Sequence, residues 1–199
     1  MPSSWWEPYI DVVPTWFRTF LTLESTASRI RTYESQYVPG LFQTPAYARA
    51  VFQLAHTDPE DVERRVELRQ ARQRLLDNPD APPVLAVIAQ NAIIQPPLTA
   101  GERLAQVDHL IALAARPGIT IVITESAGDA SPAAGAFTIL QFSDPASPDL
   151  VYVEHADNGQ YLDDPAEVAL YSGIIDTMTA LPESAAATHE LLRSMRADL

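Results

Sequence analysis

The chain has 199 residues, 47% of them hydrophobic, and a formal net charge of -13 from 13 basic and 26 acidic residues. This is a globular composition, and an isolated chain so acidic is a poor ligand for nucleic acid or an anionic membrane. There is no cysteine and every basic residue is arginine, which excludes disulfides, thiol nucleophiles and lysine Schiff bases. No signal peptide or membrane-spanning apolar stretch is visible, so we expect a cytoplasmic protein.

The N-terminal half is predicted to be mostly helical. Thr44-Pro45 and Asp58-Pro59 each place a capping residue before a proline, which is typical of a helix start. The expected elements of this half are a helix over 15–28, an extended segment over 30–38, and helices over 45–54 and 59–76.

The C-terminal half is predicted to contain a sheet. Short apolar runs bounded by turn residues indicate buried strands, and a helix between Thr99 and Arg116 separates the first two. Helices are expected over 165–180 and 183–196. The expected strands are Val84–Ala89, Ile119–Thr124, Ala136–Phe142 and Leu150–His155.

These elements predict a single α+β domain over residues 1–199. Its mixed sheet contains a β-α-β crossover with parallel strands and an antiparallel hairpin, and helices flank it. No repeat or linker divides the chain. The oligomeric state stays open, and a homodimer is one alternative.

Four side chains at strand ends are the candidates for catalysis. Glu125 and Asp129 follow the Ile119–Thr124 strand, and Glu154 and His155 end the last predicted strand. Carboxylates and histidine handle protons in enzymes, but residues at strand ends more often belong to solvated surface loops, and that interpretation is favoured for both groups. No histidine pair has metal-ligand spacing and no phosphate-binding loop is present, so neither a metal nor another cofactor is expected.

Aromatic side chains are the candidates for ligand contact. Trp5, Trp6, Trp16 and Phe20 cluster near the N-terminus and predict either core packing or the wall and lid of a pocket. Tyr33 and Gln90 are added as ligand-binding candidates. We expect the pocket at the carboxyl ends of the strands Val84–Ala89 and Ile119–Thr124, because such ends leave a crevice.

The 59–76 helix carries most of the dense positive charge. Acidic residues at offsets of three and four favour a solvated face of paired charges over an anion-binding face. Buried pairing of Arg69 or Arg72 with a carboxylate stays open.

Three stretches resemble a known family. They are Ser28–Glu34 continuing through the Val38-Pro39-Gly40-Leu41-Phe42-Gln43-Thr44 block to Ala50, then Val62–Gln73, and finally Val151–Glu154 with Tyr161–Val168. Together they resemble the domain of unknown function that follows the helix-turn-helix in actinobacterial XRE-type, antitoxin-like transcriptional regulators. The resemblance implies a role in transcriptional control, with small acidic proteins or metabolites as effectors.

The sequence departs from that family at strand ends. The family places a helix-turn-helix before the Trp-rich segment with which this sequence opens. It also has an acidic residue and an arginine pair where this chain has Gln90–Gln95. A re-lined pocket and relaxed constraint both produce this pattern.

Two functions therefore stand as hypotheses. The first is a domain that binds a hydrophobic metabolite and is derived from a regulator's effector domain, with no direct binding of nucleic acid or membrane. The alternative is a cofactor-independent enzyme that cyclises or isomerises a secondary metabolite within a shaped apolar cavity.

Overall fold

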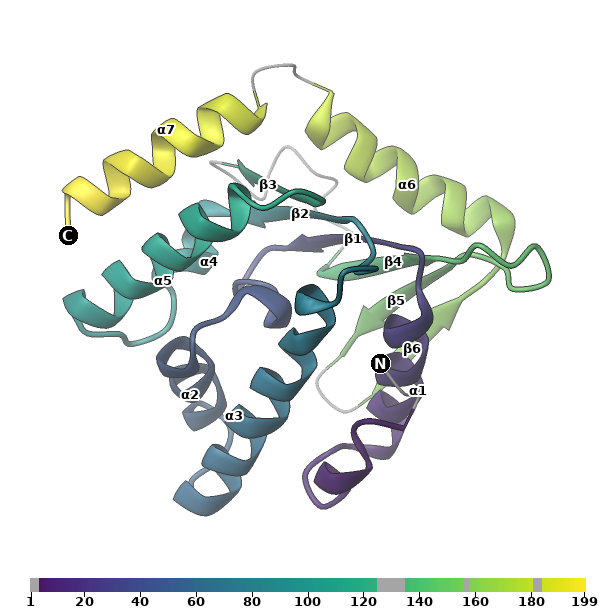
Figure 1. Ribbon diagram of the computed structural model, residues 1–199, viewed down its shortest axis with the longest axis horizontal. Helices are drawn as coiled ribbons and strands as arrows, with labels where there is room; N and C mark the ends of the chain where they lie inside the picture. The colour runs from purple at the N-terminus through teal and green to yellow at the C-terminus, as the bar shows by residue number, and fades with distance from the viewer. Residues whose placement is uncertain (1–3, 125–134, 156–157, 181–183) are drawn as a thin grey trace.

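A computed structural model describes residues 4–124, 135–155, 158–180 and 184–199 (Figure 1). The described residues form one six-stranded sheet in the order β3-β2-β1-β4-β5-β6. The strands are β1 (Arg29–Glu34), β2 (Val84–Ala89), β3 (Ile119–Thr124), β4 (Phe137–Gln141), β5 (Leu150–Glu154) and β6 (Gly159–Leu162).

The sheet is parallel on one side of β1 and antiparallel on the other. β1 pairs with β2 and β2 with β3 in parallel, whereas β1 pairs with β4 in the antiparallel sense. β4, β5 and β6 continue as an antiparallel meander. The predicted α+β class, the parallel β2–β3 crossover and the β4–β5 hairpin are confirmed, while β6 was not predicted.

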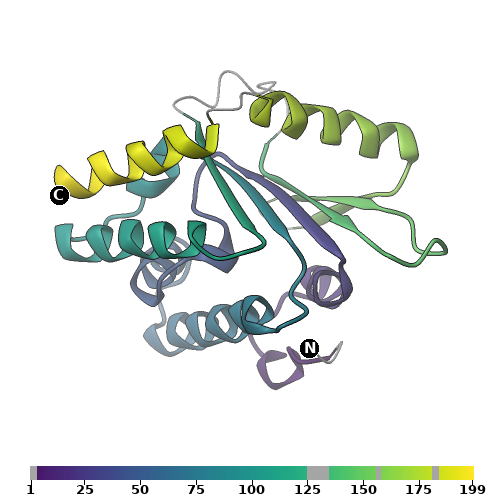
Figure 2. The same ribbon diagram turned by 45° about the horizontal axis from the view of Figure 1, so that its top comes forward.

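Helices cover both faces of the sheet (Figures 1 and 2). α6 crosses one face, and α1 and α3 lie under the other, with α2 beside α3. α7 packs against both β3 and α5. The helices are α1 (Thr15–Thr26), α2 (Pro45–Gln53), α3 (Pro59–Gln73), α4 (Gln90–Ile94), α5 (Ala100–Ala114), α6 (Pro165–Thr179) and α7 (Ser184–Ala197).

Side-chain caps fix the helix starts that the sequence predicts. The hydroxyl of Thr44 accepts from the Tyr47 N–H at the start of α2, and the Asp58 carboxylate accepts from Glu60 N–H at the start of α3. Thr99 and Glu102 complete a reciprocal capping box on α5. Local sequence is therefore sufficient to begin these helices. α4 lacks a side-chain cap and was not predicted.

Alternation along the strands divides the core into two clusters. Ile30, Ala86 and Leu140 face the larger cluster with α1, α3 and α5. Val87 and Ile139 face a smaller cluster under α6, centred on the fully buried Ile175. Because side chains alternate along a strand, successive residues of β1 enter these two environments in turn.

Candidate functional site

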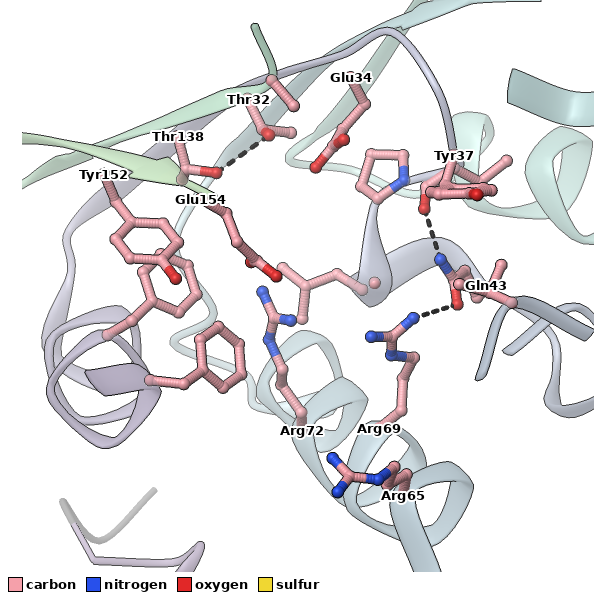
Figure 3. Close-up of a pocket in the computed structure, with 18 of the residues that line it drawn as sticks. Thr32, Glu34, Tyr37, Gln43, Arg65, Arg69, Arg72, Thr138, Tyr152 and Glu154 are labelled. Carbon is pink, nitrogen blue, oxygen red and sulfur yellow. Dashed lines mark hydrogen bonds between the residues drawn. The ribbon is translucent and has the colours of Figure 1, made fainter. Parts of the chain in front are cut away.

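A cavity of about 770 Å³ lies between the sheet and α3, a size suited to a small molecule. It opens beside β1, β4 and β5, with α1, the end of α2 and the segment after β1 completing its walls (Figure 3). The parallel and antiparallel halves of the sheet meet at the β1–β4 pair. The cavity therefore occupies the point where the strand direction changes.

Strand residues of one parity form the roof of the cavity. Thr32 and Glu34 of β1, Thr138 of β4, and Tyr152 and Glu154 of β5 all line it. The hydroxyls of Thr32 and Thr138 are 3.0 Å apart and hydrogen-bonded. The 2.0-residue repeat of a strand thus delivers both carboxylates to the same face.

Aromatic rings form one wall. Phe17 stacks on Phe20 with ring centroids 5.2 Å apart, and the Phe20 ring lies 4.3 Å from that of Tyr152. Trp16 also lines the cavity, and its carbonyl accepts a 2.9 Å hydrogen bond from the Tyr161 hydroxyl. This wall supplies apolar surface and the electron-rich faces of several rings.

The opposite wall is built from arginines on α3. Arg72 donates two 2.6 Å hydrogen bonds, from Nε and Nη2, to the carboxylate of Glu24 on α1. The side chains of Glu24 and Arg72 are 3% and 13% exposed, so this ion pair is buried. The guanidinium of Arg72 also lies 5.2 Å from the centroid of the Phe20 ring.

Arg69 lies one turn before Arg72 on the same face of α3. Its Nη1 donates to Gln43 Oε1 at 2.5 Å, and its guanidinium lies 4.3 Å above the Phe52 ring. Burial, followed by the neighbouring charge of Arg72, lowers the pKa of Arg69 to about 10. Arg69 therefore remains a cation at neutral pH and is held by an uncharged partner.

Gly40 allows the two arginines to sit against the turn before α2. A Cβ atom added at this glycine would lie 2.9 Å from Arg72 Nη1, which the buried pair with Glu24 holds in place. The Gly40 carbonyl in turn accepts a 2.9 Å hydrogen bond from Gln73 Nε2. The glycine is required here by close approach of side chains.

Glu34 and Glu154 face the arginine wall from the sheet, as Figure 3 shows. Within the described part of the chain, neither carboxyl group has an ion-pair partner within 4.0 Å. Burial, reinforced by the nearby Glu154 charge, raises the pKa of Glu34 to about 8. Burial also raises the pKa of Glu154, against the opposing effect of Arg69 and Arg72. Glu34 is half-buried and Glu154 is exposed, and both side chains line the cavity.

Tyr152 places a buried hydroxyl beside these carboxylates. The residue is 3% exposed, and its hydroxyl makes no hydrogen bond of acceptable geometry among the described residues. Burial and then the charge of Glu154 raise its pKa, so it stays protonated. Gly159 on β6 makes room for this ring, because a Cβ there would lie 2.5 Å from Tyr152 Cε2.

A second polar group lies at the rim. His56 Nδ1 is 3.0 Å from Asp61 Oδ2, and Arg65 Nε donates to the same oxygen at 2.8 Å. His56 and Arg65 line the cavity. The Asp61 carboxylate that they share balances the charge of Arg65 within α3.

The structure brings together part of the predicted site. Trp16, Phe20, Glu154 and His155 line the cavity. Trp5 and Trp6 pack against the large core cluster and do not line it, and Trp6 Nε1 donates to Thr22 Oγ1 at 3.1 Å.

Other predicted site residues lie elsewhere. Tyr33 points to the α6 face, where its ring packs near Phe137, because it alternates with Thr32 and Glu34. Gln90 begins α4 and does not line the cavity. Glu125 and Asp129 lie outside the described residues.

This cavity does not lie at the place predicted for the pocket, and residues 125–134, which follow β3, lie outside the described residues. No residue of β2 or β3 lines this cavity. It lies against β1 instead, since β1 is the central strand that joins the parallel and antiparallel halves and its pairing was not predicted.

Sequence reasoning did not assign Glu24, Glu34, Arg69 or Arg72 to the site, although it left buried pairing of Arg69 or Arg72 with a carboxylate open. The structure shows that pairing for Arg72, with Glu24. The signals were present for three of the four residues. Arg69 and Arg72 are three residues apart on a helix, hence on one face, and Glu34 shares its strand parity with Thr32. The acidic neighbours of these arginines on α3 obscured the signal. Arg64 and Arg65 do pair with such neighbours, Glu67 and Asp61.

Comparison with known proteins identifies the family. Residues 17–194 match the family described as a domain of unknown function, DUF5753. The chain belongs to this family. The matched residues include every wall of the cavity except its N-terminal margin at Val12, Pro14 and Trp16. No curated protein and no solved structure matches the chain significantly.

Neither a membrane span nor a metal centre emerges from the described residues. None of their helices combines the length and the apolar character needed to cross a bilayer. Nor do their His, Asp and Glu side chains gather in threes with metal-binding geometry. The described residues bring carboxyl, guanidinium, phenol, hydroxyl, amide and imidazole groups to the walls of the cavity.

Proposed function

We propose that this DUF5753 domain binds a hydrophobic small molecule in the cavity between β1, β4, β5 and α3. The observation that carries the proposal is a cavity of about 770 Å³ that joins an aromatic wall to a small number of convergent charged groups. Ligand sites commonly combine a mostly apolar lining with a few polar groups that fix orientation. Pockets also form where strand order or direction changes in a sheet.

The wider role that we propose is that of a regulator's effector domain. The Val38–Ala50 block resembles the corresponding stretch of actinobacterial XRE-type, antitoxin-like regulators, and residues 39–41 and 43 of that block line the cavity. A ligand in contact with this block would also touch the turn that precedes α2. Binding would then be sensed by the two helices that follow, α2 and α3.

The proposal is tested with dansylamide, a neutral fluorescent probe with an apolar ring system. We expect saturable binding to the wild-type domain, with blue-shifted dansyl emission. Thr138→Phe fills the roof of the cavity and should weaken binding by about tenfold or more. Thr120→Phe is the matched control, because Thr120 is an exposed strand residue that does not line the cavity. Equal affinity in both variants would refute binding in this cavity.

A second function is favoured by one specific observation. Glu34 carries a carboxyl group whose pKa is raised to about 8, so it holds a proton at neutral pH, and it shares the cavity with the carboxyl group of Glu154. Such a pair suits a cofactor-independent cyclase or isomerase, in which a general acid typically contributes about 10²–10⁴-fold in rate.

Chromatography of a metabolite extract separates the two functions. Incubation of an actinobacterial extract with the enzyme would replace one peak by another of the same mass, and Glu34→Gln would slow that change by about 10²-fold or more. A binding domain would instead retain a compound and release it unchanged on denaturation. Equal conversion by wild type and Glu34→Gln would exclude Glu34 as the acid.

A further inference from the structure

The charges that line the cavity do not balance. Arg65 is neutralised by Asp61, and Arg72 by Glu24. Arg69 is then the remaining guanidinium among the described lining residues, and it faces two carboxyl groups, those of Glu34 and Glu154. With histidines counted as neutral, one carboxyl group has no counter-charge from the protein. In the empty cavity a proton supplies it, because buried charge without a partner is costly.

The same region offers further groups suited to a cation. The buried hydroxyl of Tyr152 makes no hydrogen bond of acceptable geometry among the described residues, and it lies close enough to Glu154 for the two groups to affect each other's pKa. The rings of Trp16, Phe17 and Phe20 line the adjoining wall. The Arg72 guanidinium already lies over the Phe17 and Phe20 rings, so this wall supplies apolar surface for the body of a ligand, while the carboxyl groups attract its cationic end.

The cavity is less suited to an anionic ligand than to a cationic one. Arg72 uses Nε and Nη2 on Glu24, and Arg69 already donates to Gln43. An anionic ligand would add negative charge to a cavity whose carboxyl groups already outnumber its free guanidinium.

We propose that the ligand is an apolar amine, whose protonated nitrogen sits between Glu34 and Glu154 while its body lies on the aromatic wall. This assignment rests on the proposed ligand-binding function and specifies its chemistry. An ammonium group would donate to both carboxylates and to the Tyr152 hydroxyl oxygen. On binding, the carboxyl proton of Glu34 leaves to solvent and the ligand's positive charge replaces it, so the charge of the cavity is unchanged.

Three probes that share one fluorophore test the charge preference: dansylcadaverine is a cation, dansylamide is neutral and dansylglycine is an anion. We expect dansylcadaverine to bind roughly tenfold to a hundredfold more tightly than dansylamide, the gain typical of charged hydrogen bonds. Dansylglycine should bind more weakly than dansylamide.

Glu34→Gln is the decisive variant, since it keeps the side-chain shape and removes the charge. The preference for dansylcadaverine over dansylamide, measured within each protein, should fall to about twofold or less. Glu190→Gln, at an exposed position of α7 that does not line the cavity, should retain the full preference. Thermal unfolding of both variants shows that they are folded.

The affinity for dansylcadaverine should also depend on pH. It should rise by up to about tenfold per pH unit from pH 6 to about 8 and then level off, because each bound cation displaces the Glu34 proton. Glu34→Gln should flatten this profile, which separates Glu34 from the other titratable or charged groups near it. Those groups are Glu24 on α1, Arg69 and Arg72 on α3, Tyr152, Glu154 and His155 at the end of β5, and Tyr37 and Tyr47 beyond β1.

The outcomes separate this inference from the general function. Equal affinity for the cationic and neutral probes, a preference for the anion, or an unchanged preference in Glu34→Gln would overturn the amine assignment while dansylamide binding still supports a ligand site. If no probe binds in a manner sensitive to Thr138→Phe, the ligand site itself is refuted.

Discussion

One face of the sheet is packed with apolar side chains, whereas the other borders a cavity that contains charged groups. Under α6 lies an apolar cluster that includes Tyr33, Val87, Ile139 and Ile175. Of the buried residues of this cluster, Phe137 is the one that also lines the large cavity. On the other face, α1 and α3 stand off from β1, β4 and β5 and enclose the cavity with its arginines and carboxyl groups.

The difference shows how one strand serves two purposes. The charged residue that β1 turns toward α6, Arg31, reaches to the surface carboxylate of Asp176, which is 68% exposed. The charged residue that it turns toward the cavity, Glu34, has no ion-pair partner within 4.0 Å in the described part of the chain. The α6 face therefore stabilises the fold, while the cavity face holds polar groups whose cost is offset only in part by the protein. Sites that bind ligands often retain such unsatisfied groups.

The largest effect on stability is expected from breaking the buried ion pair that joins Glu24 of α1 to Arg72 of α3. Glu24→Gln should lower the free energy of unfolding by about 3–5 kcal/mol, because it leaves the Arg72 guanidinium buried without a counter-charge. Urea unfolding followed by tryptophan fluorescence measures it. Asp108→Asn is the control. It breaks an exposed pair with Arg196 and should cost less than about 1 kcal/mol. Equal effects of the two substitutions would contradict a special role of the cavity wall.

A smaller effect is expected from the titration of Glu34. Folding raises its pKa from 4.5 to about 8, so between these values the folded protein holds a proton that the unfolded chain releases. The contribution of this group to stability is therefore fully present below about pH 4.5 and is lost as the pH rises through about 8. The free energy of unfolding of the wild type should fall relative to that of Glu34→Gln across this window.

Urea titrations of both proteins at pH 5, 6, 7, 8, 9 and 9.5 provide the measurement. Above pH 8 the unfolding free energies of the two proteins should change with pH at the same rate, because Glu34 is then ionised in both the folded and the unfolded state. Parallel curves over the whole window would show that Glu34 titrates as an ordinary surface carboxyl group.

The smallest effect on stability is expected from a substitution in the apolar cluster on the α6 side of the sheet. Ile175→Val, in the closed cluster under α6, should lower the free energy of unfolding by about 0.5–1.5 kcal/mol through the loss of one buried methyl group. Dansylcadaverine affinity should change by less than about twofold. A loss of affinity much larger than this would mean that the two faces are coupled.

Local sequence was enough for most of the fold. Pro-led caps at Thr44 and Asp58 began α2 and α3 where expected, and the apolar run Val84–Ala89 became β2 with the predicted bounds. These features depend on neighbours in sequence, so periodicity and capping chemistry reveal them. β6, with only four residues and no continuous apolar run, carries too weak a pattern to be recognised alone.

The candidate site depended on the tertiary structure. Trp16, Phe20, Glu154 and His155 were identified from sequence, but the partners that give the cavity its charge were not. Glu24 and Arg72 are 48 positions apart, and nothing in either segment states that α1 and α3 pack against the same face.

The sequence by itself determined the elements, the α+β class and the parity that sends Glu34 and Tyr33 to opposite sides of β1. Only the tertiary structure decided that β1 lies between β2 and β4 and that α3 faces it across a cavity. It also decided that, among the described lining residues, two carboxyl groups face Arg69, whose hydrogen-bond partner is uncharged. The physical reason is that local periodicity fixes the direction of a side chain relative to its own element, whereas the packing of distant elements fixes what that side chain meets.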